Sequence, residues 1–115
     1  MMLIGYAIKK LQKICTKEKD AKKALPEEAA TQIFRRLADL EAFNNLSEIP
    51  FQAPPLRFHP LREDRTGQFG ITIHGLQRVC FRPVGGFSTD EEGNVVLASV
   101  TCVEITFVGN YHSYG

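Results

Sequence analysis

The sequence has no long apolar run, and this absence excludes a helix that crosses a membrane. Such a helix needs about 20 consecutive apolar residues, and no stretch of this chain approaches that length. The first ten residues, MMLIGYAIKK, have the wrong order for a signal peptide, because the lysines follow the apolar stretch instead of preceding it. We therefore expect a cytoplasmic protein that does not act at a membrane.

Cysteine is scarce as well. The chain has only Cys15, Cys80 and Cys102, an odd number without the Cys-x-x-Cys spacing of a zinc or redox site. Reduced, mostly buried thiols in a reducing compartment are the expectation. We predict neither a metal site nor a cofactor.

The chain also lacks a large net charge, because its total is only +1. A generic binder of nucleic acids or membranes is therefore not indicated by the total. The distribution is uneven, and the segment 57–82 contains five arginines: Arg57, Arg62, Arg65, Arg78 and Arg82. Against two acids in the same segment they leave a local charge of +3, whereas residues 83–115 have four acids and neither Lys nor Arg. Arginine favours planar contacts to phosphate.

At 115 residues the chain is expected to form a single domain, 1–115. Apolar residues at helical spacing predict one helix over residues 3–17, although MMLIG could instead form a short strand. Residues 18–25 are expected to connect it to a second helix that begins at Pro26 and ends at Asn44–Asn45. Two amphipathic helices need a surface to cover, and the β-prone second half of the chain supplies one.

That second half begins with a proline-rich loop and an edge strand around 56–58, followed by a hairpin. Residues 68–74 alternate between apolar and polar side chains, Gly75 offers a turn, and residues 78–82 alternate again on the way back. The longest β-prone run, 95–108, is expected to lie beside this hairpin, with Val103, Ile105 and Phe107 on one face. The predicted fold class is α+β: two N-terminal helices packed on a small twisted antiparallel sheet of about three to five strands.

The polar side chains of the hairpin and of the chain end suggest chemistry on phosphate. We expect His59 and His112 to lie at strand ends beside the face that bears the arginines. Two histidines and an arginine could cleave RNA without a metal: one group takes the proton of the 2′-OH, another protonates the leaving 5′-oxygen, and Arg stabilises the charge on phosphorus. Tyr111 could stack on a base. Structural roles are also open, since Arg78 or Arg82 could instead pair with Glu104 across the sheet.

The segment FHPLREDRTGQFGITIHGLQRVCFR, together with the closing Asn110-Tyr111-His112, resembles the HigB branch of the RelE/ParE toxin superfamily. Its family pattern has a histidine before a Leu-Lys-Gly-Asp-Arg run, a hairpin with a strand arginine, and a closing Asp-Tyr-His. The resemblance covers nearly the whole chain. It implies a RelE/ParE-like fold and a type II toxin that acts as a ribosome-dependent mRNA interferase in the bacterial cytoplasm. It also implies two kinds of partner: a helix-turn-helix antitoxin, HigA-like, in a hetero-oligomer, and the ribosome with its mRNA.

Carried over by position, the resemblance assigns two sets of residues. The predicted catalytic residues are His59, Arg78, Tyr111 and His112. The predicted RNA-binding residues are Arg57, Arg62, Arg65, Arg82 and Asn110.

Two alternatives stay open because the chain departs from the family pattern. Asn110 replaces an Asp, so a carboxylate that could orient a histidine is missing, and Glu63 replaces a glycine beside Arg62. One alternative is a non-nucleolytic toxin like the ParE branch, which inhibits gyrase. The other is a degenerate toxin that acts only as an antitoxin-binding module.

Overall fold

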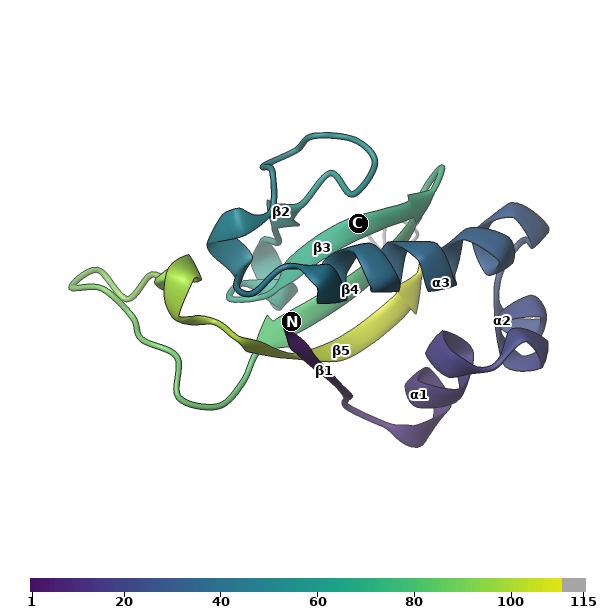
Figure 1. The fold of residues 1–115 in the computed structure, drawn as a ribbon, viewed down its shortest axis with the longest axis horizontal. Coiled ribbons are helices and arrows are strands. Elements are labelled where there is room, and N and C mark those ends of the chain that lie inside the picture. Colours follow the sequence, from purple (N-terminus) through teal and green to yellow (C-terminus); the bar gives the residue numbers. More distant parts are fainter. Residues whose placement is uncertain (111–115) are drawn as a thin grey trace.

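The computed structural model describes residues 1–110, and these form an α+β fold in which helices pack on one five-stranded sheet. Figure 1 shows the long helix α3 lying across the sheet. The strand order is β1-β5-β4-β3-β2. The strands are β1 (Leu3–Tyr6), β2 (His59–Pro60), β3 (Phe69–His74), β4 (Gln77–Pro83) and β5 (Cys102–Gly109).

The predicted α+β class is confirmed, but the sheet is mixed and not antiparallel throughout. β2, β3, β4 and β5 pair antiparallel, but β1 pairs parallel with β5, with Leu3 opposite Cys102. The chain thus begins as the sheet's edge strand, as the alternative interpretation of MMLIG allowed. Local periodicity favoured a helix there, since a partner strand about a hundred residues away leaves no local signal.

The N-terminal region contains three helices instead of two: α1 (Lys9–Thr16), α2 (Glu18–Ala24) and α3 (Glu27–Ala42). The break between α1 and α2 is at Lys17, whose backbone is extended. The predicted connector 18–25 is helical, and its Glu18 and Lys22 form an ion pair of 2.7 Å one turn apart. Within residues 1–110, no helix is long and apolar enough to cross a membrane.

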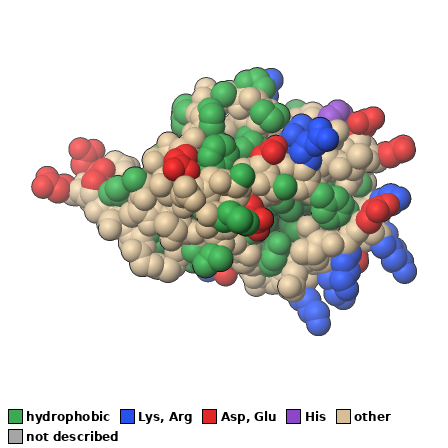
Figure 2. Space-filling view, in the orientation of Figure 1, with side chains coloured by type: hydrophobic (Ala, Val, Ile, Leu, Met, Phe, Trp, Pro, Cys, Tyr) green, Lys and Arg blue, Asp and Glu red, His purple; other side chains and the backbone are tan. Residues whose placement is uncertain are grey.

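Strand β5 starts later than predicted, at Cys102. Residues 84–101 leave the sheet after β4 and form an excursion that projects from the body of the molecule (Figure 1). Its tip is a turn in which Asp90 Oδ1 accepts hydrogen bonds from the backbone N–H groups of Glu92 and Asn94, both at 2.9 Å. Figure 2 shows acidic side chains gathered at this end. A segment that contains Gly85, Gly86, Gly93 and Asp90 favours turns over a continuous strand.

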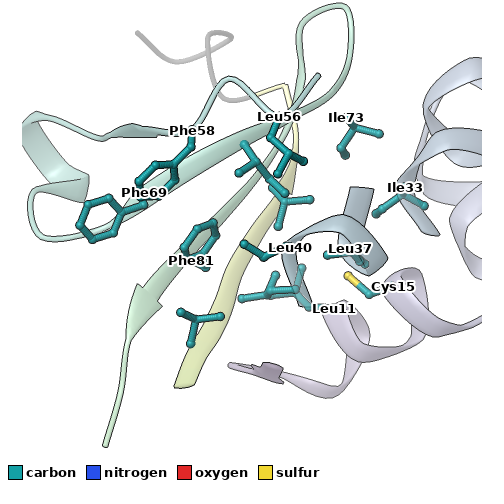
Figure 3. Close-up of a cluster of buried hydrophobic side chains, with 14 of the residues drawn as sticks. Leu11, Cys15, Ile33, Leu37, Leu40, Leu56, Phe58, Phe69, Ile73 and Phe81 are labelled. Carbon is teal, nitrogen blue, oxygen red and sulfur yellow. The ribbon is translucent and has the colours of Figure 1, made fainter. Parts of the chain in front are cut away.

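The hydrophobic core lies between the helices and one face of the sheet. Figure 3 shows α3 residues such as Ile33 and Leu40 pointing toward that face. Both are fully buried, as are Ile71 and Ile105 on the sheet side. Where the helices end, the rings of Phe58, Phe69 and Phe81 stack, with centroids 5.4 to 6.3 Å apart. These aromatic rings extend the core beneath the strands that hold the predicted site.

The predicted hairpin is confirmed as β3 and β4. His74 pairs with Gln77 around a two-residue turn, Gly75-Leu76, and Gly75 has a φ of +57°. A positive φ at the first turn position belongs to the hairpin turns that match strand twist, and glycine adopts it without steric cost. The turn thereby fixes which side chains of the two strands share a face.

Candidate functional site

A single row of residues crosses the sheet on the face opposite the helices. His59 pairs with Gly70, Gly70 with Cys80, and Cys80 with Phe107, so one residue comes from each of four adjacent strands. Gly70 and Cys80 lie between residues that point into the core, and neighbouring residues of a strand point to opposite faces. The row therefore lies on the outer face, at the middle of the sheet.

Phe107 joins this face because of an irregularity in the pairing. Simple alternation would put its ring with Val103 and Ile105 in the core. A register shift between Cys80 and Phe81 leaves Thr106 as an extra residue on β5, and this brings Phe107 opposite Cys80. The prediction that Phe107 shares a face with Val103 and Ile105 is thus wrong.

His59 is held at the start of the row by its backbone and its ring. Its Nδ1 lies 2.7 Å from the carbonyl oxygen of Arg57. A carbonyl oxygen only accepts hydrogen bonds, so Nδ1 donates, and in the neutral imidazole Nε2 is the atom that can take up a proton. The ring lies directly against β3: a Cβ on Gly70 would be 3.3 Å from Nε2. Glycine at position 70 allows this approach.

One of the predicted arginines, Arg65, reaches this row, and a second, Arg78, lies in the neighbouring row. The guanidinium of Arg65 lies over the ring of Phe107, 4.8 Å from its centroid. Arg78 belongs to the next row, opposite Thr72, and its Nη1 donates to the carbonyl oxygens of Gly75 (2.6 Å) and Gln77 (3.2 Å). Burial raises the pKa of the Cys80 thiol to about 11. The positive charges of Arg65 and Arg78 lower this pKa, but their effect is smaller than that of burial. This thiol is therefore protonated at neutral pH and is a poor nucleophile.

The row of Thr72 and Arg78 contains two buried polar atoms. Thr72 Oγ1 and Arg78 Nε are both inaccessible to solvent and have no hydrogen-bond partner within residues 1–110. Such atoms are rare in folded proteins, because a buried polar group without a partner costs about 1–3 kcal/mol. Sequence alternation had put Thr72 on the polar face, but nothing in the sequence indicated that its hydroxyl is buried beside Arg78.

The remaining predicted residues are placed differently. Arg82 lies on the same face one row beyond Cys80, where its Nε and Nη2 both donate to Glu104 Oε1 (3.0 and 2.7 Å). Arg57 and Arg62 have exposed side chains in the segments before and after β2. Half-buried Asn110 follows Gly109, which pairs with Arg78. Tyr111 and His112 lie outside the described residues.

The segment that contains Arg65 is fixed over the sheet by a second contact. Thr106 Oγ1 donates to Gln68 Oε1 at 2.6 Å, which joins the start of β3 to β5. A short 3₁₀ helix, Glu63–Arg65, precedes it and presents the two acidic side chains of Glu63 and Asp64 to solvent. The acids thus lie in the same short segment as Arg62 and Arg65.

Elsewhere, an apolar hollow of about 320 Å³ lies between the end of α3 and the proline-rich loop, and it contains none of the predicted site residues. No group of three or more His, Cys, Asp or Glu side chains within residues 1–110 could hold a metal ion.

A comparison of the sequence with protein-family models gives no match, and a search of curated proteins gives none either. Membership of the RelE/ParE superfamily therefore stays a prediction.

Proposed function

We propose that this protein is the toxin of a type II toxin–antitoxin system and that it cleaves messenger RNA on the ribosome. The observation that supports this best is the gathering of His59, Arg65 and Arg78 on the outer face of the sheet. His59 has a proton-accepting Nε2 there, and the two guanidinium groups flank the same row. These three residues are 6 to 19 positions apart along the chain and lie on one face of the sheet, as a site for phosphate chemistry requires.

The proposed reaction is an attack of the ribose 2′-oxygen on the adjacent phosphorus. The new O2′–P bond forms while the P–O5′ bond breaks, which gives a 2′,3′-cyclic phosphate and a 5′-hydroxyl end. One group must accept the 2′-OH proton and another must protonate the 5′-oxygen, and His59 and His112 are assigned to these roles together. Arg78 is assigned to the charge that develops on the phosphoryl oxygens. Tyr111 and Asn110 would position the nucleotide.

The partners follow from the same proposal. The ribosome presents the mRNA, and a helix-turn-helix antitoxin neutralises the toxin in a hetero-oligomer, in the cytoplasm of a bacterium.

The test is expression in a bacterial host, followed by mapping of mRNA ends. The wild-type chain is expected to stop translation and to leave cuts with 5′-hydroxyl ends. Replacing His59 by Gln is expected to lower cleavage at least about a hundredfold, the usual loss for a general acid or base. His74→Gln is the matched control, because His74 is exposed at the far end of β3, beside the turn.

The outcome of this experiment separates the alternatives. A growth block with intact mRNA, retained when His59, Arg78 and His112 are replaced together, would select the ParE-like toxin. Absence of toxicity combined with tight binding of the antitoxin would select the degenerate binding module.

A further inference from the structure

The two kinds of basic residue occupy separate parts of this molecule. All seven lysines lie between residues 9 and 23, and all seven arginines lie between residues 35 and 82. With only Glu18 and Asp20 opposing the lysines, the segment 9–23 carries a formal charge of +5. The other 100 residues then carry −4 of the total of +1. We call residues 9–23 the lysine lobe.

The fold turns every one of these lysines outward. α1 and α2 bury their apolar side chains, Leu11, Ile14, Cys15 and Ala21, in the core. The seven lysines are all exposed: Lys9, Lys10, Lys13, Lys17, Lys19, Lys22 and Lys23. Among them only Lys22 takes part in an ion pair with another of the described residues. The lysine lobe thus presents a dense positive surface, because only two acidic side chains within it oppose the charge of the seven lysines.

The lobe and the acidic excursion lie at different ends of the molecule. Figure 1 shows α1 and α2 on the side away from the excursion 84–101. Figure 2 shows basic side chains projecting at that side, with some acidic ones nearby, and acidic side chains at the excursion. The longest extent of the molecule is 43 Å, several times the Debye length of about 8 Å at physiological salt. The charges at the two ends therefore act separately on a polyanion: the lysine lobe attracts it, and the acidic excursion repels it.

We propose that the lysine lobe is a docking surface for the phosphate backbone of base-paired RNA, separate from the arginine-bearing sheet face. Lysine acts as a point charge on a flexible stem, whereas arginine makes planar contacts. The segment 9–23 contains neither an arginine nor an aromatic residue that could read or stack on bases. Contacts of this kind fix the position of a nucleic acid without reading its sequence.

Other polyanions fit the lobe less well. Binding at a membrane surface requires an apolar helix face that can enter the lipid, and the apolar face of α1 is already buried in the core. A protein interface has an apolar centre with aromatic anchors, and the lobe has none. A small anion needs converging donors, whereas these lysines spread over two helices, each about 10–12 Å long. The choice of RNA over DNA rests on the proposed function.

The test measures binding to a blunt 20-base-pair RNA duplex at several salt concentrations, with the whole protein. The triple variant Lys10→Gln, Lys13→Gln, Lys17→Gln is expected to bind roughly tenfold more weakly at moderate salt. Its slope of log K against log salt should be smaller by about two to three, since each lost phosphate contact removes a little under one. Replacing the same lysines by Arg preserves the charge and should restore binding.

A second variant separates this surface from the proposed active face. Arg65→Gln with Arg78→Gln should leave duplex binding within about twofold, even if all mRNA cleavage is lost. Equal loss in both variants would overturn the separation of the two surfaces, and failure of the wild-type protein to bind the duplex would overturn the docking proposal. Tighter binding to a DNA duplex of the same sequence would overturn the choice of RNA. Binding only to vesicles of equal parts phosphatidylcholine and phosphatidylserine would show a membrane surface as the partner instead.

Discussion

Gly70 allows the ring of His59 to lie against β3, and replacing it by Ala tests whether that close approach exists. A Cβ at this position would meet Leu61 Cδ2 at 3.1 Å and His59 Nε2 at 3.3 Å. Both distances are shorter than ordinary van der Waals contact, so the neighbours would have to move. Leu61 is buried, and His59 is fixed through Nδ1 to the Arg57 carbonyl, so neither side chain moves freely.

The expected magnitude follows from two opposing effects. Alanine in a strand is more stable than glycine by about 0.5–1 kcal/mol, because less backbone entropy is lost on folding. Forcing an extra methyl into a packed site costs about 1–3 kcal/mol. The net effect is a loss of roughly 1 kcal/mol in the free energy of unfolding, or a fall of about 4 °C in Tm for a domain of this size.

The assay is urea unfolding of Gly70→Ala beside Gly5→Ala. Gly5 is a strand glycine too, but its added Cβ would have only the Val103 carbonyl oxygen within 4 Å, at 3.9 Å. The control is expected to be as stable as the wild type or slightly more stable. NMR of the imidazole nitrogens should report a displaced His59 ring in Gly70→Ala alone. Equal stability of both variants, with an unchanged His59 spectrum, would refute the packing argument.

Three further outcomes are expected. Phe81→Ala should lower the free energy of unfolding by about 3–5 kcal/mol in urea titrations, because Phe81 is fully buried among stacked rings; a loss below about 1 kcal/mol would contradict this. A double-mutant cycle of Arg82→Gln and Glu104→Gln should give a coupling of less than about 1 kcal/mol, since half of the Arg82 side chain is exposed. Burial raises the pKa of Cys15 to about 12 and of Cys80 to about 11, so an unfolded chain loses these protons first as pH rises. Stability should therefore fall from about pH 8.5 upward, and a Cys15→Ala, Cys80→Ala variant should show a smaller fall.

Much of the fold could be predicted from local patterns. Helix α3 and the hairpin of β3 and β4 follow from helical periodicity, from Pro26 and from Gly75, and all three features act within a few residues. The features that were predicted wrongly depend on contacts between distant parts of the chain or on backbone conformations that leave no pattern in the sequence. The pairing of β1 with β5 leaves no local signal, and neither does the extended Lys17 that separates α1 from α2. β2 has only two residues, because Pro60 has no N–H to donate to a longer ladder.

The candidate site was predictable only in part, for the same reason. Alternation put Arg78 on the polar face of the hairpin, and His59 and Arg65 were assigned to the site on other grounds, but the pattern did not show how deeply each side chain is buried. Cys80 is as buried as any core residue, although it lies on the outer face. The register shift that brings Phe107 under Arg65 depends on how β4 and β5 align, which only the assembled sheet determines.

The position of β1 also has a consequence for how this chain folds during synthesis. Its partner β5 is synthesised about a hundred residues later, so β1 waits unpaired while everything between them is made. Closing so long a loop is entropically slow, and proteins dominated by such distant pairings fold slowly. A nascent chain that still lacks β5 therefore has neither a closed sheet nor the Phe107 ring beneath Arg65. Assembly of the candidate site therefore has to wait until β5 has been synthesised.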